Sequence, residues 1–234
     1  MARPPRPRPA VRSRVTLGID EAGRGPAVGP MVMAAVAIDS RAAAALTRLG
    51  LTDSKAYGAG DDAHALRCEL AAEVRKRAIF VQTIVVEHTE IDERVARNEL
   101  NVLERELAVK LIEQSPTVDK IIADGKRMFM PLTLRYAHFE SRDHAEEHHA
   151  SVAAASVIAK VLRDIRFHEI KKQYEVELGP IGGGGYANAS TRRWLRAYVE
   201  LYGRLPAETR LSWPHPYVED LIEVRRPTPQ LELI

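Results

Sequence analysis

The most constraining feature of this chain is an apolar segment, residues 14–19, that ends directly in two adjacent acids, Asp20 and Glu21. A turn rich in glycine and proline then leads to a second apolar run, residues 31–38, and the two runs together predict a hairpin of strands. Neighbouring residues of a strand point to opposite faces, so both acids cannot be buried in one core. Two carboxylates at such a place are costly unless a cation compensates them, and hard divalent cations prefer oxygen ligands. An ordinary acidic turn is the alternative that these residues leave open.

Further along the chain, apolar runs alternate with segments of helical periodicity. This alternation predicts an α/β or mixed sheet with helices on its faces. Five glycines between residues 179 and 185 mark the end of the core and the start of a C-terminal appendage. The further expected strands are residues 79–86, 119–123 and 132–139, and the expected helices are residues 61–77, 99–114, 144–175, 190–202 and 216–224.

More acids follow at places where strands end or helices begin. Asp124 comes directly after the apolar residues 121–123 and before a glycine. Acids at the ends of different strands can meet at one edge of a sheet, although a lone Asp–Gly pair is most often a turn. Glu140, Asp143, Glu146 and Glu147 precede a helix of small residues, where carboxylates in the first turn are also favoured by the helix dipole.

The formal net charge of +2 conceals an uneven distribution. Residues 1–14 hold five arginines and no acid, so the other residues together carry a net charge of −3. A segment of this kind cannot bury apolar surface and is expected to be a flexible cationic arm. Residues 185–210 hold five more arginines against two glutamates. The near-neutral total therefore does not exclude a protein that binds nucleic acid.

Six motifs occur in an order and spacing that carry a family resemblance. They are GIDEAGRGPAVGPM, LTDSK, ADG, AAASVIAKVLRD, GGGGY and LSW, and they run from Val15 to Trp213. In this the chain resembles the ribonuclease H type 2 (ribonuclease HII) family. The resemblance implies a ribonuclease-H-like mixed five-stranded sheet flanked by helices, with a small helical C-terminal appendage. It also implies a divalent-metal endonuclease that cuts RNA in RNA–DNA hybrids and at ribonucleotides in duplex DNA, leaving 5′-phosphate and 3′-OH ends.

The resemblance also implies the catalytic acids. Asp20, Glu21 and Asp124 match the first three carboxylates of a two-metal site for Mg²⁺ or Mn²⁺. The fourth departs from the type 2 pattern, because the residue ten positions before Ser156 is Glu146, whereas type 2 enzymes have an aspartate there. This segment is similar to the sister ribonuclease HIII family, which uses glutamate. We therefore assign Glu146 as the fourth ligand and keep Asp143 as the alternative.

Substrate-binding residues are implied in the same way. Gly23, Arg24 and Gly25 match a loop whose backbone reads the 2′-OH of the ribonucleotide. Lys55 matches a lysine near the phosphates, and Tyr186 matches a tyrosine that stacks on the sugar at the RNA–DNA junction. Asp164 also matches a family position, and we interpret it as structural.

The expected organisation is a basic arm (residues 1–14), a catalytic domain (15–178), a substrate-binding appendage (179–226) and a flexible tail (227–234). The tail ends in Gln-Leu-Glu-Leu-Ile, which resembles the short peptide that bacterial proteins insert into the sliding clamp; a frayed or self-docked end is the alternative. One cysteine and no long apolar stretch indicate a cytoplasmic protein without a membrane span. We expect a monomer.

Two competing interpretations remain at this stage. Residues 144–148 fit the H-x-x-E-H pattern of a zinc protease, because histidines four apart share one face of a helix. That pattern explains none of the other motifs. A catalytically inactive hybrid-binding module is the second alternative, and the presence of all four acids argues against it.

Overall fold

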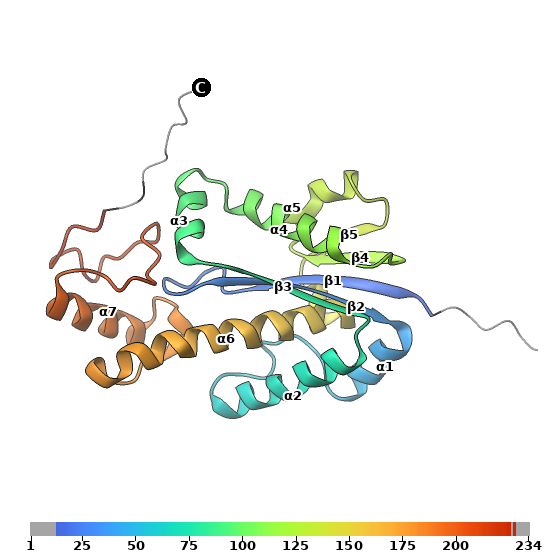
Figure 1. Ribbon diagram of the computed structural model, residues 1–234, viewed down its shortest axis with the longest axis horizontal. Coiled ribbons are helices and arrows are strands. Elements are labelled where there is room, and N and C mark those ends of the chain that lie inside the picture. Colours follow the sequence, from blue (N-terminus) through green and yellow to red (C-terminus); the bar gives the residue numbers. More distant parts are fainter. Residues whose placement is uncertain (1–12, 226, 228–234) are drawn as a thin grey trace, which may run out of the picture.

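The computed structural model describes residues 13–225 and 227, and its centre is a mixed sheet of five strands (Figure 1). The strand order is β3-β2-β1-β4-β5; β2 is antiparallel to both β1 and β3, while β4 is parallel to both β1 and β5. This arrangement confirms the predicted fold class. The strands are β1 (Val15–Ala22), β2 (Met31–Asp39), β3 (Phe80–Val86), β4 (Lys120–Asp124) and β5 (Phe139–Arg142).

Helices cover both faces of the sheet. In Figure 1, α6 lies below the sheet with α1 and α2, and α3, α4 and α5 lie above it. The α-helices are α1 (Ser40–Arg48), α2 (Asp61–Arg77), α3 (His88–Ala96), α4 (Leu100–Gln114), α5 (Lys126–Phe129), α6 (Ala150–Leu178) and α7 (Ala189–Tyr202). Within the described residues there are also three short 3-10 helices: η1 (Met130–Leu134), η2 (Ala145–Glu147) and η3 (Gly183–Gly185).

The continuous apolar run of β2 is explained by its burial on both faces. Its odd-numbered residues pack with the leucines of α4, and its even-numbered residues pack with the small residues of α6. Leu17 and Ile19 of β1 belong to the α4 side. The same alternation therefore directs Asp20 toward α6 and Glu21 toward α4.

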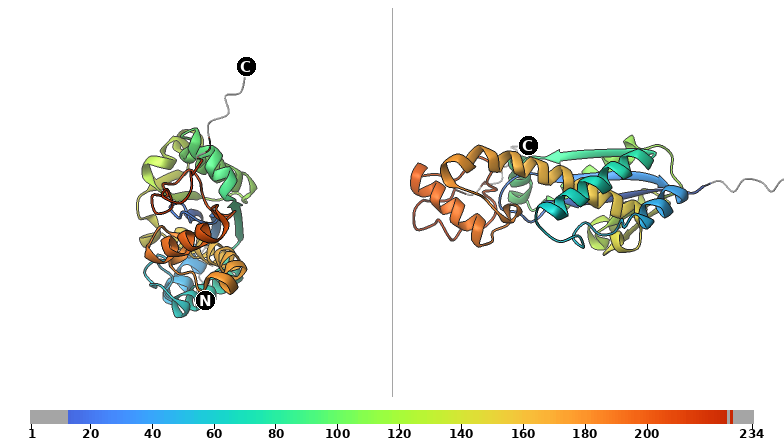
Figure 2. Two further views of the ribbon diagram at one scale, coloured as in Figure 1. Left: turned by 90° about the vertical axis from the view of Figure 1, so that its left-hand side faces the viewer. Right: turned by 90° about the horizontal axis from the view of Figure 1, so that it is seen from below.

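The long helix α6 continues past the sheet into the C-terminal appendage, so the two parts share one element (Figure 2). Its distal half packs with α7 around Phe167, Tyr174 and Trp194. Ala27 and Val28, from the turn between β1 and β2, belong to the same apolar cluster. The appendage is thereby attached to the turn that carries Gly23, Arg24 and Gly25.

Some sequence predictions are wrong. Residues 132–139 are not a strand: Pro131 suits the first turn of a helix, η1 forms there, and β5 begins only at Phe139. Residues 216–224 form turns and no helix: the N–H groups of Leu221 and Ile222 both donate to the carbonyl oxygen of Val218, so regular helical pairing is not formed. Helices α1 and α3 were not predicted.

The predicted helix over residues 144–175 begins only at Ala150. His144 has a left-handed backbone (φ 57°) and η2 follows it, so His144 and His148 do not share a helix face. The helical argument for a zinc protease is therefore wrong. The N-terminal arm through residue 12 and the clamp-like residues 230–234 lie outside the described residues. No helix in the described part of the chain is long and apolar enough to cross a membrane.

Candidate active site

Parallel pairing of β1 with β4 brings two of the predicted acids to one edge of the sheet. Ile19 is paired with Ala123, so the next residues of the two strands are Asp20 and Asp124. Asp20 is buried, and Asp124 accepts a hydrogen bond from the backbone N–H of Ala145 (2.9 Å). Two carboxylates separated by about 100 residues in sequence therefore stand side by side.

Asp20 and Glu21 meet different surroundings because they face opposite sides of the sheet. Burial raises the pKa of Asp20 well above its ordinary value, and the charges of Glu21 and Asp124 raise it further. A hydrogen bond from Ser156 of α6 partly offsets this effect. For Glu21, burial and the charge of Glu104 on α4 are the leading causes that raise the pKa to about 7. In the absence of a cation, the fold therefore favours the protonated form of both carboxyl groups over the charged form.

The structure separates the two candidates for the fourth carboxylate. Glu146, in η2, is buried, and its Oε2 atom has no hydrogen-bond partner in the described part of the chain. Burial raises its pKa, as do the charge of Asp124 and a hydrogen bond with it. Asp143 is exposed and accepts a hydrogen bond from the backbone N–H of Lys126 at the start of α5 (2.8 Å). Glu146 therefore joins the acidic cluster, whereas Asp143 holds a helix end.

Lys55 is a cation that faces this cluster. Its pKa is raised by the charges of Asp53, Asp20, Glu146 and Asp124, although burial acts in the opposite direction. Its exposed side chain leaves it free to meet a ligand. Lys55 and Arg24 both lower the pKa of Glu21, but burial and the neighbouring acids outweigh them, and its pKa stays raised.

This donor set fits a hard divalent cation. Carboxylate oxygens are the ligands that Mg²⁺ and Mn²⁺ prefer, and the buried, unpartnered Oε2 atom of Glu146 is a vacant donor. As they stand in residues 13–225 and 227, no three His, Cys, Asp or Glu side chains are close enough to hold one ion among them. The fit therefore rests on the chemistry and charge of the four acids.

The turn after β1 carries the predicted loop, residues 23–25. Gly23 has φ of +88°, and a Cβ atom there would lie 2.7 Å from the carbonyl oxygen of Pro30, so only glycine fits. The ring of Tyr186, which is half exposed, lies against Gly25: a Cβ atom on Gly25 would be 3.4 Å from its Cε1 atom. The guanidinium of Arg24 donates to Glu104 (2.8 Å) and to Asn101 (2.7 Å).

A sequence model of one family, ribonuclease HII, matches residues 17–215, which is most of the chain. The chain belongs to the ribonuclease HII family. It is a ribonuclease H endonuclease, and the matched span includes every assigned site residue from Asp20 to Tyr186.

Individual relatives agree with this assignment. The chain is 38% identical to ribonuclease HII of Pyrobaculum arsenaticum, over 84% of this chain and 93% of the relative. The crystal structure of ribonuclease H2 from Pyrococcus horikoshii has a TM-score of 0.74 at 29% identity, covering 88% of this chain and 96% of that one. Ribonuclease HII of Archaeoglobus fulgidus, solved as a complex with PCNA, has a TM-score of 0.71 at 30% identity, covering 86% and 95%.

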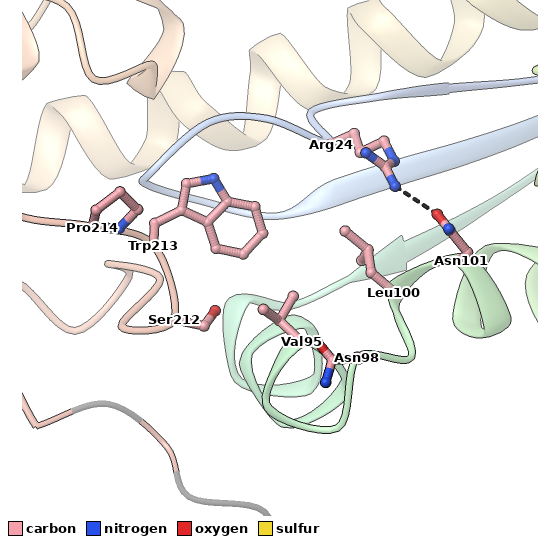
Figure 3. A pocket seen from close by; sticks show the side chains of 8 residues that line it. All are labelled: Arg24, Val95, Asn98, Leu100, Asn101, Ser212, Trp213 and Pro214. Atoms are coloured by element: carbon pink, nitrogen blue, oxygen red, sulfur yellow. Dashed lines mark hydrogen bonds between the residues drawn. The ribbon is translucent and has the colours of Figure 1, made fainter.

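A pocket of about 380 Å³ is lined by residues that include Arg24, Leu100, Asn101 and Trp213 (Figure 3). The indole of Trp213 closes one end, and its Nε1–H donates to the carbonyl oxygen of Gly25 (3.1 Å). Asp92 of α3 supports this wall by accepting hydrogen bonds from the backbone of Leu211 and Ser212. The C-terminal segment is thus tied to the loop that follows β1.

Sequence analysis missed three buried charged residues around this enzyme's loop: Glu104, Arg163 and Arg210. Each forms a hydrogen bond with a residue 80 or more positions away in the sequence, so no local pattern marks it. The only available signal was that Arg163 and Arg210 fall inside or beside the motifs AAASVIAKVLRD and LSW. Asp164, interpreted as structural, lies within ion-pair distance of Arg67, Lys160 and His64.

Proposed function

We propose that this endonuclease cuts RNA in RNA–DNA hybrids and single ribonucleotides within duplex DNA, using Mg²⁺ or Mn²⁺ and leaving 5′-phosphate and 3′-OH ends. Such an activity removes misincorporated ribonucleotides and primer RNA. The observation that carries the proposal is the adjacency of Asp20, Asp124 and the buried Glu146 at one sheet edge. Family membership supports the choice of an RNA–DNA substrate.

Asp20, Glu21, Asp124 and Glu146 would hold the divalent cations. When bound, a pair of such ions supplies activation of the attacking water and stabilisation of the charge that develops on the scissile phosphate. The raised pKa values of Asp20, Glu21 and Glu146 support this role, because a bound cation most strongly stabilises the ionised form of carboxylates that repel one another.

The remaining site residues bind and orient the nucleic acid. The 2′-OH distinguishes RNA from DNA at a given residue, and a backbone-lined loop such as residues 23–25 can bind it without reading the base. Lys55 carries a positive charge beside the acids and would contact a phosphate next to the cut. Tyr186 presents an exposed ring against Gly25 on which a sugar could stack.

The test is cleavage of two substrates, a DNA duplex with one ribonucleotide and an all-RNA strand paired with DNA, each in Mg²⁺ and in Mn²⁺. The wild-type enzyme should cut both next to a ribonucleotide, while Asp20→Asn and Asp124→Asn should bind without cutting. The matched control is Asp220→Asn, an exposed acid in the appendage that pairs with Arg196. Undiminished cutting by Asp20→Asn or Asp124→Asn would refute the site assignment.

We also propose that the C-terminal residues 230–234 bind a sliding clamp. The supporting observations are their Gln-Leu-Glu-Leu-Ile sequence and the similarity of this chain to the Archaeoglobus fulgidus enzyme solved with PCNA. Deletion of these five residues should abolish clamp binding in a pull-down or calorimetric titration and leave cleavage of a short duplex unchanged. Equal clamp affinity of the full-length and truncated enzymes would rule the tail out.

A further inference from the structure

Arg210 is a completely buried arginine whose side chain ends beneath the loop of residues 23–25. The three guanidinium nitrogens, Nε, Nη1 and Nη2, each donate to a backbone carbonyl oxygen of the turn that follows β1. The acceptors are Gly23 (2.6 Å), Arg24 (2.8 Å) and Gly29 (2.9 Å).

The backbone around Arg210 also bonds to the turn that follows β1. Its own N–H donates to the carbonyl oxygen of Ala27 (2.8 Å), and Thr209 forms a β-bridge with Val28. The guanidinium lies against the Trp213 ring, 5.0 Å from its centre. Within the described residues no acid forms a salt bridge with Arg210, so the carbonyl dipoles of the turn are its principal electrostatic partners.

These bonds determine where the N–H groups of the loop point. In a planar trans peptide the C=O and the N–H lie on opposite sides. Because the carbonyls of Gly23 and Arg24 turn inward to Arg210, the N–H groups of Arg24 and Gly25 turn outward. Both residues are exposed, and in the described part of the chain neither N–H donates a hydrogen bond.

We infer that Arg210 is a positioning residue that sets the preference for ribonucleotides, because it orients the N–H groups of Arg24 and Gly25 toward the substrate's 2′-OH. This inference rests on the proposed function and adds to it the residue that organises the recognition loop. The guanidinium holds its donors in a rigid planar fork on three separate nitrogens, whereas the three donors of a lysine radiate from one rotatable nitrogen. Lysine at this position keeps the positive charge but lacks the planar arrangement of donors.

The experiment measures equilibrium binding of two duplexes that differ in one 2′-OH, in an Asp20→Asn background that prevents cutting. Arg210→Lys should lower the ratio of the two affinities about tenfold, the effect of one oriented hydrogen bond. Its affinity for the all-DNA duplex should stay within about twofold. An unchanged ratio in an Arg210→Lys protein that circular dichroism shows to be folded would overturn the inference.

Trp213→Phe is the matched control. It removes a donor to the same loop, but the carbonyl of Gly25 belongs to a peptide whose nitrogen is that of Pro26, which has no N–H. The affinity ratio should therefore survive Trp213→Phe. If Trp213→Phe lowers the ratio as much as Arg210→Lys does, general loosening of the loop explains both, and the inference fails.

Amide exchange in the Asp20→Asn protein with Arg210 intact tests the inference without altering the loop, and it still decides if Arg210→Lys does not fold. The N–H groups of Arg24 and Gly25 should be protected by the ribonucleotide duplex and not by the all-DNA duplex. Equal protection by both duplexes would overturn the inference. The proposed function fails if the enzyme with all four acids cuts neither ribonucleotide substrate. If that enzyme cuts both substrates, but Arg210→Lys keeps the wild-type ratio of the two affinities, only the role of Arg210 fails.

Discussion

Gly18 lies so close to Ser151 that a Cβ atom on Gly18 would be 2.1 Å from the carbonyl carbon of Ser151. The contact joins the centre of β1 to the first turn of α6, backbone against backbone. It explains why α6 begins with small residues, which let the helix approach the strand that carries Asp20. The same approach brings Ser156 within hydrogen-bonding reach of Asp20.

Gly18→Ala should therefore destabilise the protein strongly, because the obstructing atoms are backbone and cannot rotate away. Overpacking of this kind costs about 3 kcal/mol, which is roughly 6–12 °C in Tm for a chain of this size. Thermal unfolding followed by circular dichroism measures the change. Gly50→Ala is the control, since its added Cβ atom meets nothing within 4 Å. Its only cost is the strain of an alanine at a φ of +88°, which is about 1–2 kcal/mol. Equal losses in the two variants would contradict the steric explanation.

The metal-free protein should lose stability as the pH rises from about 4.5 to about 7. The pKa of Glu21 is about 7 in the folded state and 4.5 as an ordinary glutamate, so in this window the folded state holds a proton that the unfolded state has released. The stabilisation is complete below pH 4.5 and disappears as the pH passes 7. Unfolding midpoints in EDTA should show this fall, and Glu21→Gln should make it smaller, while the raised pKa values of Asp20 and Glu146 maintain the remainder. Midpoints of the two proteins that change in parallel across this window would contradict the assignment.

The acidic core of the site was predictable from sequence for a physical reason. Asp20 and Asp124 each follow directly after an apolar run, a local pattern that is visible in the sequence; β4 ends at Asp124, whereas β1 continues past Asp20 to Ala22. The direction of Glu21 followed from the period of two in a strand. By contrast, the ion pair of Arg24 with Glu104 joins the turn after β1 to α4. The residue pattern of neither segment predicts this pairing.

Glu146→Gln and Asp143→Asn should separate the two candidates for the fourth ligand. Glu146 is buried beside Asp124, so removing its charge should reduce kcat by at least about 100-fold, as expected for loss of a metal ligand. Asp143 accepts a hydrogen bond from the backbone N–H of Lys126. Asp143→Asn should therefore lower the free energy of unfolding by about 1 kcal/mol, as for loss of a helix cap, and change activity little. Steady-state cleavage and urea unfolding of both variants decide; an inactive Asp143→Asn beside an active Glu146→Gln would reverse the assignment.

The errors in the fold prediction also have identifiable causes. Leu132, Leu134 and Tyr136 alternate as in a half-buried strand, yet Leu134 is 94% exposed because Pro131 starts a 3-10 turn that points it outward. Arg210 and Arg163 were overlooked because buried arginines are rare. Their burial is tolerated here because backbone carbonyls, which no sequence pattern reveals, accept their hydrogen bonds.

Lys55→Met should affect metal binding and substrate binding in opposite directions. Lys55 faces Asp20, Asp124 and Glu146, so removing its charge leaves the cluster more negative and should lower the Mg²⁺ concentration needed for half-maximal activity. The same change removes a phosphate contact, so KM for the duplex should rise and its dependence on salt should weaken. Lys76→Met, an exposed lysine paired with Glu73 on α2, is the control and should change neither quantity. A Lys55→Met enzyme that needs more Mg²⁺ than the wild type would show that Lys55 does not oppose the cation.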